Sequence, residues 1–154
     1  MTTVEEIMTT ELVTLTASDS IETARQLMAA RHIRHIPIVD SDHVLIGLVT
    51  HRDVLAASLS PLEPVEDAQR TAWEAATPLQ DIMARELDVV SEKMNLREAA
   101  LRLQAHKYGC LPVVSQGKLK GIITDSDFVA VAINLLEQLE LIEPLAETAP
   151  EDDL

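Results

Sequence analysis

The sequence predicts an α/β fold built from two tandem copies of one βαββα unit, because a single pattern occurs twice along the chain. Ile7-Met8 recurs 75 positions later as Ile82-Met83. One residue is missing from the second copy before Gly121, so Gly47 and Gly121 are 74 positions apart. The matches fall at turn, apolar and polar positions alike, and repetition at one spacing is the signature of a repeat fold.

Each copy opens with a short extended segment, residues 12–15 or 87–90, and continues into an amphipathic helix. Ser20 and Asn95 directly precede these helices, where a short polar side chain commonly caps the first turn. The apolar residues that follow recur at helical spacing. They are Ile21, Ala24, Leu27 and Met28 in the first copy and Leu96, Ala99, Ala100 and Leu103 in the second.

A hairpin and a second helix complete each copy. The strands are residues 36–39 and 45–49 in the first copy and residues 111–114 and 119–123 in the second, each pair joined by a polar turn. Pro37 and Pro112 lack an N–H donor, so we expect them at a strand start or a strand edge. The second helix begins near Thr50 or Thr124, and in the second copy it extends over roughly residues 128–141.

The expected organisation is repeat 1 over residues 1–60, a linker over 61–78, repeat 2 over 79–142 and an acidic tail over 143–154. Within the linker region, Asp67–Ala76 can form a short helix that includes Trp73. The tail is rich in carboxylates, which is typical of a solvated segment.

Composition excludes several classes of function. Hydrophobic residues make up 47% of the chain and aromatic residues 2%, so the core must be aliphatic. The net charge of −14 disfavours nucleic acid and anionic membranes, which are bound mainly through cationic side chains. The chain has one cysteine, and its N-terminus shows neither the basic nor the apolar region of a signal peptide. No apolar run is long enough to span a bilayer. We therefore expect a cytoplasmic protein.

The most specific local motif is a threonine and an aspartate at the start of each second helix. Thr50 and Asp53 follow Gly47 in the first copy, and Thr124 and Asp127 follow in the second. Thr-x-x-Asp before an apolar run fits a capping box with Asp in place of Glu. The same residues can bind a nucleotide, because a helix start offers N–H donors to phosphate and a carboxylate can accept from ribose hydroxyls. The motif alone leaves both interpretations open.

Other candidate sites are weaker. His32 and His35 lie across a helix-to-strand boundary without a third ligand, so a structural zinc site is not expected. Cys110 lies in an apolar strand and is interpreted as a small core residue. The sequence contains no Gly-x-Ser-x-Gly or Cys-x-x-Cys motif, so we expect that the chain is not an enzyme.

The two copies resemble a pair of cystathionine-beta-synthase (CBS) domains, the arrangement called a Bateman module. Three motifs carry this resemblance in both copies, between Val4 and about Leu136: Asp/Glu-Ile-Met, hydrophobic-Pro-hydrophobic-Val, and Gly-hydrophobic-x-Thr-x-x-Asp. The resemblance implies two units packed about a pseudo-twofold axis. It also implies clefts that bind adenosine compounds, namely AMP, ADP, ATP, S-adenosylmethionine or NAD. A scaffold with empty clefts is the alternative, since a fold does not establish a function.

The resemblance also implies roles for individual residues. Asp53 and Asp127 would hold ribose hydroxyls, and Thr50 and Thr124 would face phosphate, with Arg34 and Arg52 as further phosphate contacts. The adenine would lie against Thr14, Ile33, His35 and Pro37 of the first copy, or Val89, Tyr108, Cys110 and Pro112 of the second. No cofactor, metal or catalytic residue is implied; the expected ligand is AMP, ADP or ATP.

The sequence further predicts a homodimer and two unequal clefts. The second helices carry more apolar surface than one small sheet covers, and such a surface usually marks an interface. The residues in question are Val54, Leu55, Leu59, Phe128, Val131, Ala132, Leu135 and Leu136. The first copy contributes Arg34, His35 and Arg52, whereas their counterparts in the second copy are Gly109, Cys110 and Ser126. The pseudo-twofold geometry implied by the resemblance often brings one copy's basic residues to the nucleotide whose ribose the other copy holds. We therefore expect the cleft of Asp127 to bind more tightly than the cleft of Asp53.

Overall fold

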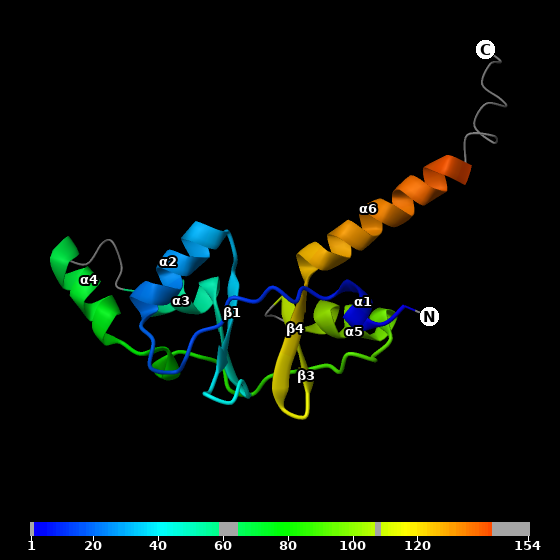
Figure 1. Cartoon of the computed structure of the whole chain (residues 1–154). Coiled ribbons are helices and arrows are strands. Elements are labelled where there is room, and N and C mark those ends of the chain that lie inside the picture. The colour runs from blue at the N-terminus through cyan, green and yellow to red at the C-terminus, as the bar shows by residue number, and fades with distance from the viewer. Residues whose placement is uncertain (1, 59–64, 107–108, 143–154) are drawn as a thin grey trace, which may run out of the picture.

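The computed structural model describes residues 2–58, 65–106 and 109–142 and confirms an α/β fold of two repeats. Repeat 1 contains α2 (Ile21–Arg31), β1 (His35–Val39), β2 (Leu45–Thr50) and α3 (His51–Ala57). Repeat 2 contains α5 (Leu96–Ala105), β3 (Cys110–Ser115), β4 (Lys118–Thr124) and α6 (Asp125–Ile142). The two antiparallel hairpins lie in the middle of the molecule, and the helices lie to either side (Figure 1). The remaining elements are α1 (Val4–Ile7), α4 (Asp67–Ala76) and the 3-10 turn η1 (Leu79–Asp81).

The predicted helix starts are confirmed in detail. The Ser20 hydroxyl accepts a hydrogen bond from the Thr23 N–H at 3.1 Å, which caps α2. The Asn95 side chain accepts from the Arg97 N–H at 2.7 Å, which caps α5. The helix predicted over Asp67–Ala76 is present as α4. The caps stabilise the starts of α2 and α5, because a short polar side chain satisfies a free N–H group of the first turn.

The first extended segment of each repeat forms a single parallel bridge rather than a full strand. Leu15 pairs with Ile38, and Val90 pairs with Val113. This pairing explains Pro37, which is the third residue of β1 and not its start. The Pro37 carbonyl accepts from the Leu15 N–H at 3.2 Å, so the backbone polar groups of Pro37 point away from β2. The missing N–H of the proline therefore removes no hydrogen bond between β1 and β2.

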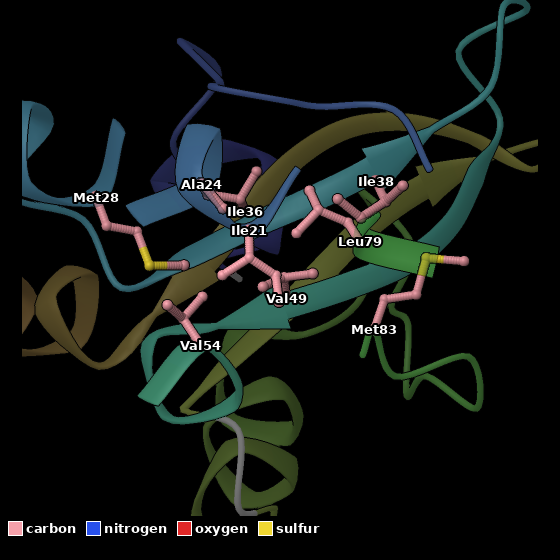
Figure 2. Close-up of a cluster of buried hydrophobic side chains, with 9 residues drawn as sticks. All are labelled: Ile21, Ala24, Met28, Ile36, Ile38, Val49, Val54, Leu79 and Met83. Carbon is pink, nitrogen blue, oxygen red and sulfur yellow. The ribbon is translucent and has the colours of Figure 1, made fainter. Parts of the chain in front are cut away.

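Each repeat has its own aliphatic core, but neither core is closed by its own repeat. Leu79 and Met83, from the start of repeat 2, pack into the cluster of repeat 1 (Figure 2). In return Val4, from the start of repeat 1, is buried in the core of repeat 2. The Val4 N–H donates to the Met94 carbonyl at 2.9 Å, which holds the exchanged segment in place. The two repeats therefore share their cores.

A small third cluster joins the hairpins. Leu48 of β2 packs against Cys110 of β3 and Ile122 of β4. Backbone bonds continue the contact at the hairpin turns, where the Leu45 N–H donates to the Gly117 carbonyl at 3.1 Å. The hairpins thus form the interface between repeats.

The apolar surface predicted over both second helices is only partly correct. Val54 is 1% exposed and belongs to the core of repeat 1, because α3 presents it to the sheet. Phe128 and Val131 pack against the core of repeat 2. Leu59 lies outside the described residues. The exposed part of the predicted set consists of Leu55, Ala132, Leu135 and Leu136.

The exchanged segments approach the hairpins closely at Gly47 and Gly121. A Cβ on Gly121 would lie 2.7 Å from the Met8 sulfur and 2.9 Å from the Thr9 carbonyl oxygen. At Gly47 the atoms within 3 Å both belong to the flexible Met83 side chain.

We predict that Gly121→Ala lowers the free energy of unfolding by about 1–3 kcal/mol, as overpacking commonly does. Gly47→Ala should cost less, because the Met83 side chain can rotate away whereas the Thr9 backbone cannot. Urea unfolding of both variants measures the difference. Equal losses would contradict the close backbone approach at Gly121.

Candidate functional site

The threonine and aspartate of repeat 1 form a capping box at the start of α3. Thr50 has extended backbone angles, and its hydroxyl accepts from the Asp53 N–H at 3.1 Å. The Asp53 carboxylate accepts from the Thr50 N–H at 2.8 Å through Oδ2. The capping interpretation is therefore confirmed here. It occupies one carboxylate oxygen, and in the described structure no protein group donates to Oδ1.

The matching aspartate of repeat 2 is held more completely. Asp127 accepts from the Thr124 N–H at 2.8 Å through Oδ2 and from the Thr9 hydroxyl at 3.1 Å through Oδ1. Thr9 lies on the exchanged N-terminal segment, and its counterpart 75 positions on is Ala84, which has no hydroxyl. Thr9 is not among the site residues predicted from the sequence. The signal for it is that this threonine has no matching hydroxyl residue in the second copy.

Two arginines, Arg34 and Arg52, lie near the start of α3, and repeat 2 has no basic residue at the matching positions. The His51 N–H donates to the Arg34 carbonyl at 2.8 Å, which brings Arg34 beside Arg52 at the start of the helix. In repeat 2 the equivalent bond joins the Asp125 N–H to the Gly109 carbonyl at 3.4 Å. Both arginines are exposed, and among the described residues neither has a carboxylate partner. The same backbone arrangement thus places Arg34 and Arg52 at the second helix of repeat 1 and the Asp125 carboxylate at the second helix of repeat 2.

The two repeats bring polar side chains together at Gly109. A Cβ on this glycine would lie 3.2 Å from Asp125 Oδ2 and 3.4 Å from His35 Nε2. Gly109 has a φ of 74°, a conformation that favours glycine. His35 was predicted to contact the ligand, and Asp125 was not. Because both side chains lie close to Gly109, Asp125 adds an acidic group to the candidate site.

The residues predicted to contact adenine differ in burial. Pro37, Cys110 and Pro112 are buried within their strands. Thr14, Ile33 and Val89 are partly buried; Ile33 packs against the core of repeat 1, and the Val89 carbonyl accepts from Arg102 at 3.4 Å. Tyr108 lies outside the described residues. Contact of these residues with a base stays a prediction.

The described residues contain neither a candidate metal site nor a candidate membrane span. No group of three or more His, Cys, Asp or Glu side chains in that part of the chain could hold a metal ion. None of its helices combines the length and the apolar character needed to cross a bilayer.

Fold and site together define a tandem-repeat α/β protein whose two repeats present the same threonine–aspartate helix start. The family model described as CBS domain matches residues 4–60 and 79–134. The chain therefore belongs to the CBS domain family, and it contains a pair of such domains.

Known proteins agree with this assignment. A Vibrio cholerae protein provisionally assigned to acetoin utilization (AcuB) is 44% identical with a TM-score of 0.77, over 91% of this chain and 98% of that one. CBSX2, known from Arabidopsis thaliana, has a structure in complex with AMP that is 30% identical with a TM-score of 0.72, over 88% and 98%. The uncharacterized protein MJ1225 of Methanocaldococcus jannaschii is 31% identical over 126 residues. That match covers 82% of this chain and only 41% of MJ1225.

Cys110 is chemically protected by its place between the hairpins. It is 2% exposed, and burial, with the nearby Asp125 charge, raises the pKa of its thiol to about 12. The protonated thiol is a poor nucleophile. Because the pKa is raised on folding, this thiol contributes stability below its ordinary pKa, and the contribution is lost as the pH rises toward 12.

We predict that iodoacetamide at pH 8 leaves Cys110 unmodified in the folded protein and alkylates it in urea. Mass spectrometry after timed quenching measures both rates. A folded-state rate close to the unfolded rate would contradict the burial of this thiol.

Proposed function

We propose that this protein is a cytoplasmic, non-enzymatic regulatory module that binds an adenine nucleotide between its repeats. Occupancy would change the packing of the two repeats, and a partner would respond to that change. One observation carries the proposal: the threonine–aspartate helix start occurs in both repeats, and exposed arginines accompany one of them. AMP, ADP or ATP is the proposed ligand, with S-adenosylmethionine or NAD as alternatives.

Charge supports a phosphate site in repeat 1. A chain of net charge −14 repels a polyanion unless cations are placed locally. Arg34 and Arg52 are such cations, since both are exposed and no carboxylate among the described residues neutralises them. Arginine suits this role because its planar guanidinium can bind phosphate oxygens in pairs.

The capping aspartates are compatible with ribose binding. Each carboxylate oxygen has two lone pairs, so an oxygen that accepts one backbone bond can still accept a hydroxyl. The Thr9 hydroxyl competes for this capacity at Asp127, whereas Asp53 has a free Oδ1 among the described groups. We retain the Asp127 cleft as the tighter site, because phosphates would reach the arginines of the other repeat.

Kinship supports an adenosine ligand more than a catalytic role. CBSX2, which is 30% identical, has been crystallised with AMP. Against catalysis, Cys110 is buried and protonated. A ligand-free scaffold is the second candidate, and the capping box at Thr50 favours it, because capping alone accounts for Asp53. A homodimer is part of the proposal.

We predict that adenine nucleotides raise the melting temperature. A ligand that binds only the folded state stabilises it by about 2.7 kcal/mol at a hundredfold excess over its dissociation constant. Guanosine and cytidine nucleotides should raise it less. Differential scanning fluorimetry with all of them at matched phosphate number makes the comparison. Equal shifts would indicate a nonspecific phosphate effect.

A further prediction concerns the carboxylates. A hydrogen bond to a charged group contributes about 1.5–3 kcal/mol, so Asp127→Ala should weaken its site about tenfold or more. Asp53→Ala should affect the weaker site. Since both variants remove a cap, urea unfolding must first confirm that each remains folded. If titration calorimetry then finds affinity and stoichiometry unchanged in both, the carboxylates act only as helix caps and the nucleotide proposal loses its main support.

Another prediction separates phosphate from nucleoside recognition. Arg34→Ala should weaken ATP and ADP more than adenosine, because the guanidinium faces only phosphate in the proposed site. Arg31→Ala is the matched control, since it removes an exposed arginine from the end of α2. Titration calorimetry with the three ligands measures the effect. An equal loss for adenosine and ATP would place Arg34 outside the phosphate site.

A further inference from the structure

We propose that Thr9 sets the sugar specificity of the Asp127 site, so that this site recognises one ribose hydroxyl whereas the Asp53 site recognises a neighbouring pair. The inference rests on the proposed function, because it takes each aspartate to hold the sugar of a bound nucleotide. It goes beyond that function by assigning a role to a residue outside the threonine–aspartate motif. Thr9 acts through Asp127, as a positioning residue, and does not itself need to touch the ligand.

The first observation is that paired backbone fixes Thr9 beside the start of α6. Thr9 forms an antiparallel bridge with Ile122 of β4, through two hydrogen bonds of 2.9 and 3.0 Å. Figure 1 shows the N-terminal segment crossing β4 in this region. Gly121 permits the close approach, since a Cβ there would lie 2.9 Å from the Thr9 carbonyl oxygen. From this position the Thr9 hydroxyl donates to Asp127 Oδ1 at 3.1 Å.

The second observation is that repeat 1 has the same backbone pairing without the hydroxyl. Ala84 forms an antiparallel bridge with Leu48 of β2, again through hydrogen bonds of 2.9 and 3.0 Å. Ala84 also occupies the position of Thr9 in the repeat. Because the two segments are paired alike, the hydroxyl at Thr9 is a difference of side chain and not of fold.

The third observation is the number of hydrogen bonds that each carboxylate already accepts. A carboxylate has about four acceptor sites, two on each oxygen. At Asp127, Oδ2 accepts from the N–H and, at 3.4 Å, from the hydroxyl of Thr124, while Oδ1 accepts from Thr9. At Asp53, Oδ2 accepts from the Thr50 N–H, and no group of the described residues donates to Oδ1. The Asp127 carboxylate therefore has an open acceptor site on Oδ1 alone, whereas Asp53 has open sites on both oxygens.

The two carboxylates consequently suit different sugars. Ribose presents two neighbouring hydroxyls, which can donate one hydrogen bond to each oxygen of a carboxylate. Asp53 can accept both hydroxyls in this way. Asp127 can accept one, so the other hydroxyl gains nothing from this carboxylate. The Asp127 site should therefore tolerate a sugar that lacks one hydroxyl, and the Asp53 site should not.

The test isolates one site at a time and varies the sugar. Asp53→Asn leaves the Asp127 carboxylate as the only one available to a sugar, and Asp127→Asn leaves that of Asp53. Asparagine keeps an oxygen that can cap the helix, but its amide nitrogen cannot accept a hydroxyl. Titration calorimetry of each protein with AMP, 2′-deoxy-AMP and 3′-deoxy-AMP then measures the contribution of each hydroxyl.

The two proteins should respond differently to the analogues. In Asp53→Asn, one of the two deoxy analogues should bind within about twofold of AMP, because it keeps the hydroxyl that Oδ1 accepts. In Asp127→Asn, both analogues should bind about tenfold or more weakly than AMP, because each loses a hydrogen bond to a charged group.

Exchanging the residue between the repeats supplies the matched variants. Thr9→Val keeps the branched shape and removes the hydroxyl, so in the Asp53→Asn background both analogues should become about tenfold weaker than AMP. Thr9→Ser retains a hydroxyl and should keep the wild-type preference. Ala84→Thr in the Asp127→Asn background should allow one analogue to bind about as well as AMP. Each comparison is between ligands on one protein, so a general loss of stability does not imitate the result.

Two outcomes would overturn this inference alone. One is wild-type binding of AMP together with the same analogue preference in Thr9→Val and Thr9→Ser. The other is an Asp53→Asn protein for which both analogues are about tenfold weaker than AMP. If AMP binds to none of the proteins, wild type included, the proposed function fails and this inference fails with it. Thr9 is exposed, so its variants should remain folded, which circular dichroism checks.

Discussion

The structure depends on the exchange of the segments that precede each repeat. Val4 is buried in the core of repeat 2, and Leu79 and Met83 are buried in the core of repeat 1. Removing either segment would open a core that the rest of its own repeat cannot refill. The exchange also presses the segments against Gly47 and Gly121, which fixes how closely the chain passes the hairpins. The two hairpins are thereby held against each other.

Within this symmetric frame the two repeats have different chemistry. Arg34 and Gly109 occupy equivalent places, as do Arg25 and Ala100. Arg34 gives repeat 1 a cation beside its second helix, and Arg25 gives the same repeat a polar link to α4. Repeat 1 therefore offers positive charge, whereas repeat 2 offers an apolar surface. A duplicated fold can divide tasks in this way because single side chains change the surface without changing the backbone.

The local structure could be predicted from the sequence because its signals are local. Ser20 and Asn95 cap their helices through residues two or three positions away, and the hairpins follow from two apolar runs around a turn. Contacts between distant residues could not be predicted. Thr9 bonds Asp127 across 118 positions, and no local pattern specifies that partner. Val54 has the same apolar character whether it faces the sheet or solvent, so its burial was misjudged. Pro37 could be placed correctly only once Leu15 was known to pair beside it.

The length of α6 has a mechanical consequence. The helix begins at Asp125, and Asp127 in its first turn is tied to Thr124 and Thr9. At about 1.5 Å per residue its 18 residues make a rod of about 27 Å. A tilt of about 10° at the first turn would displace the far end by about 5 Å on that length. On this length, a small adjustment at the aspartate would become a displacement of several ångströms at the tip of the helix.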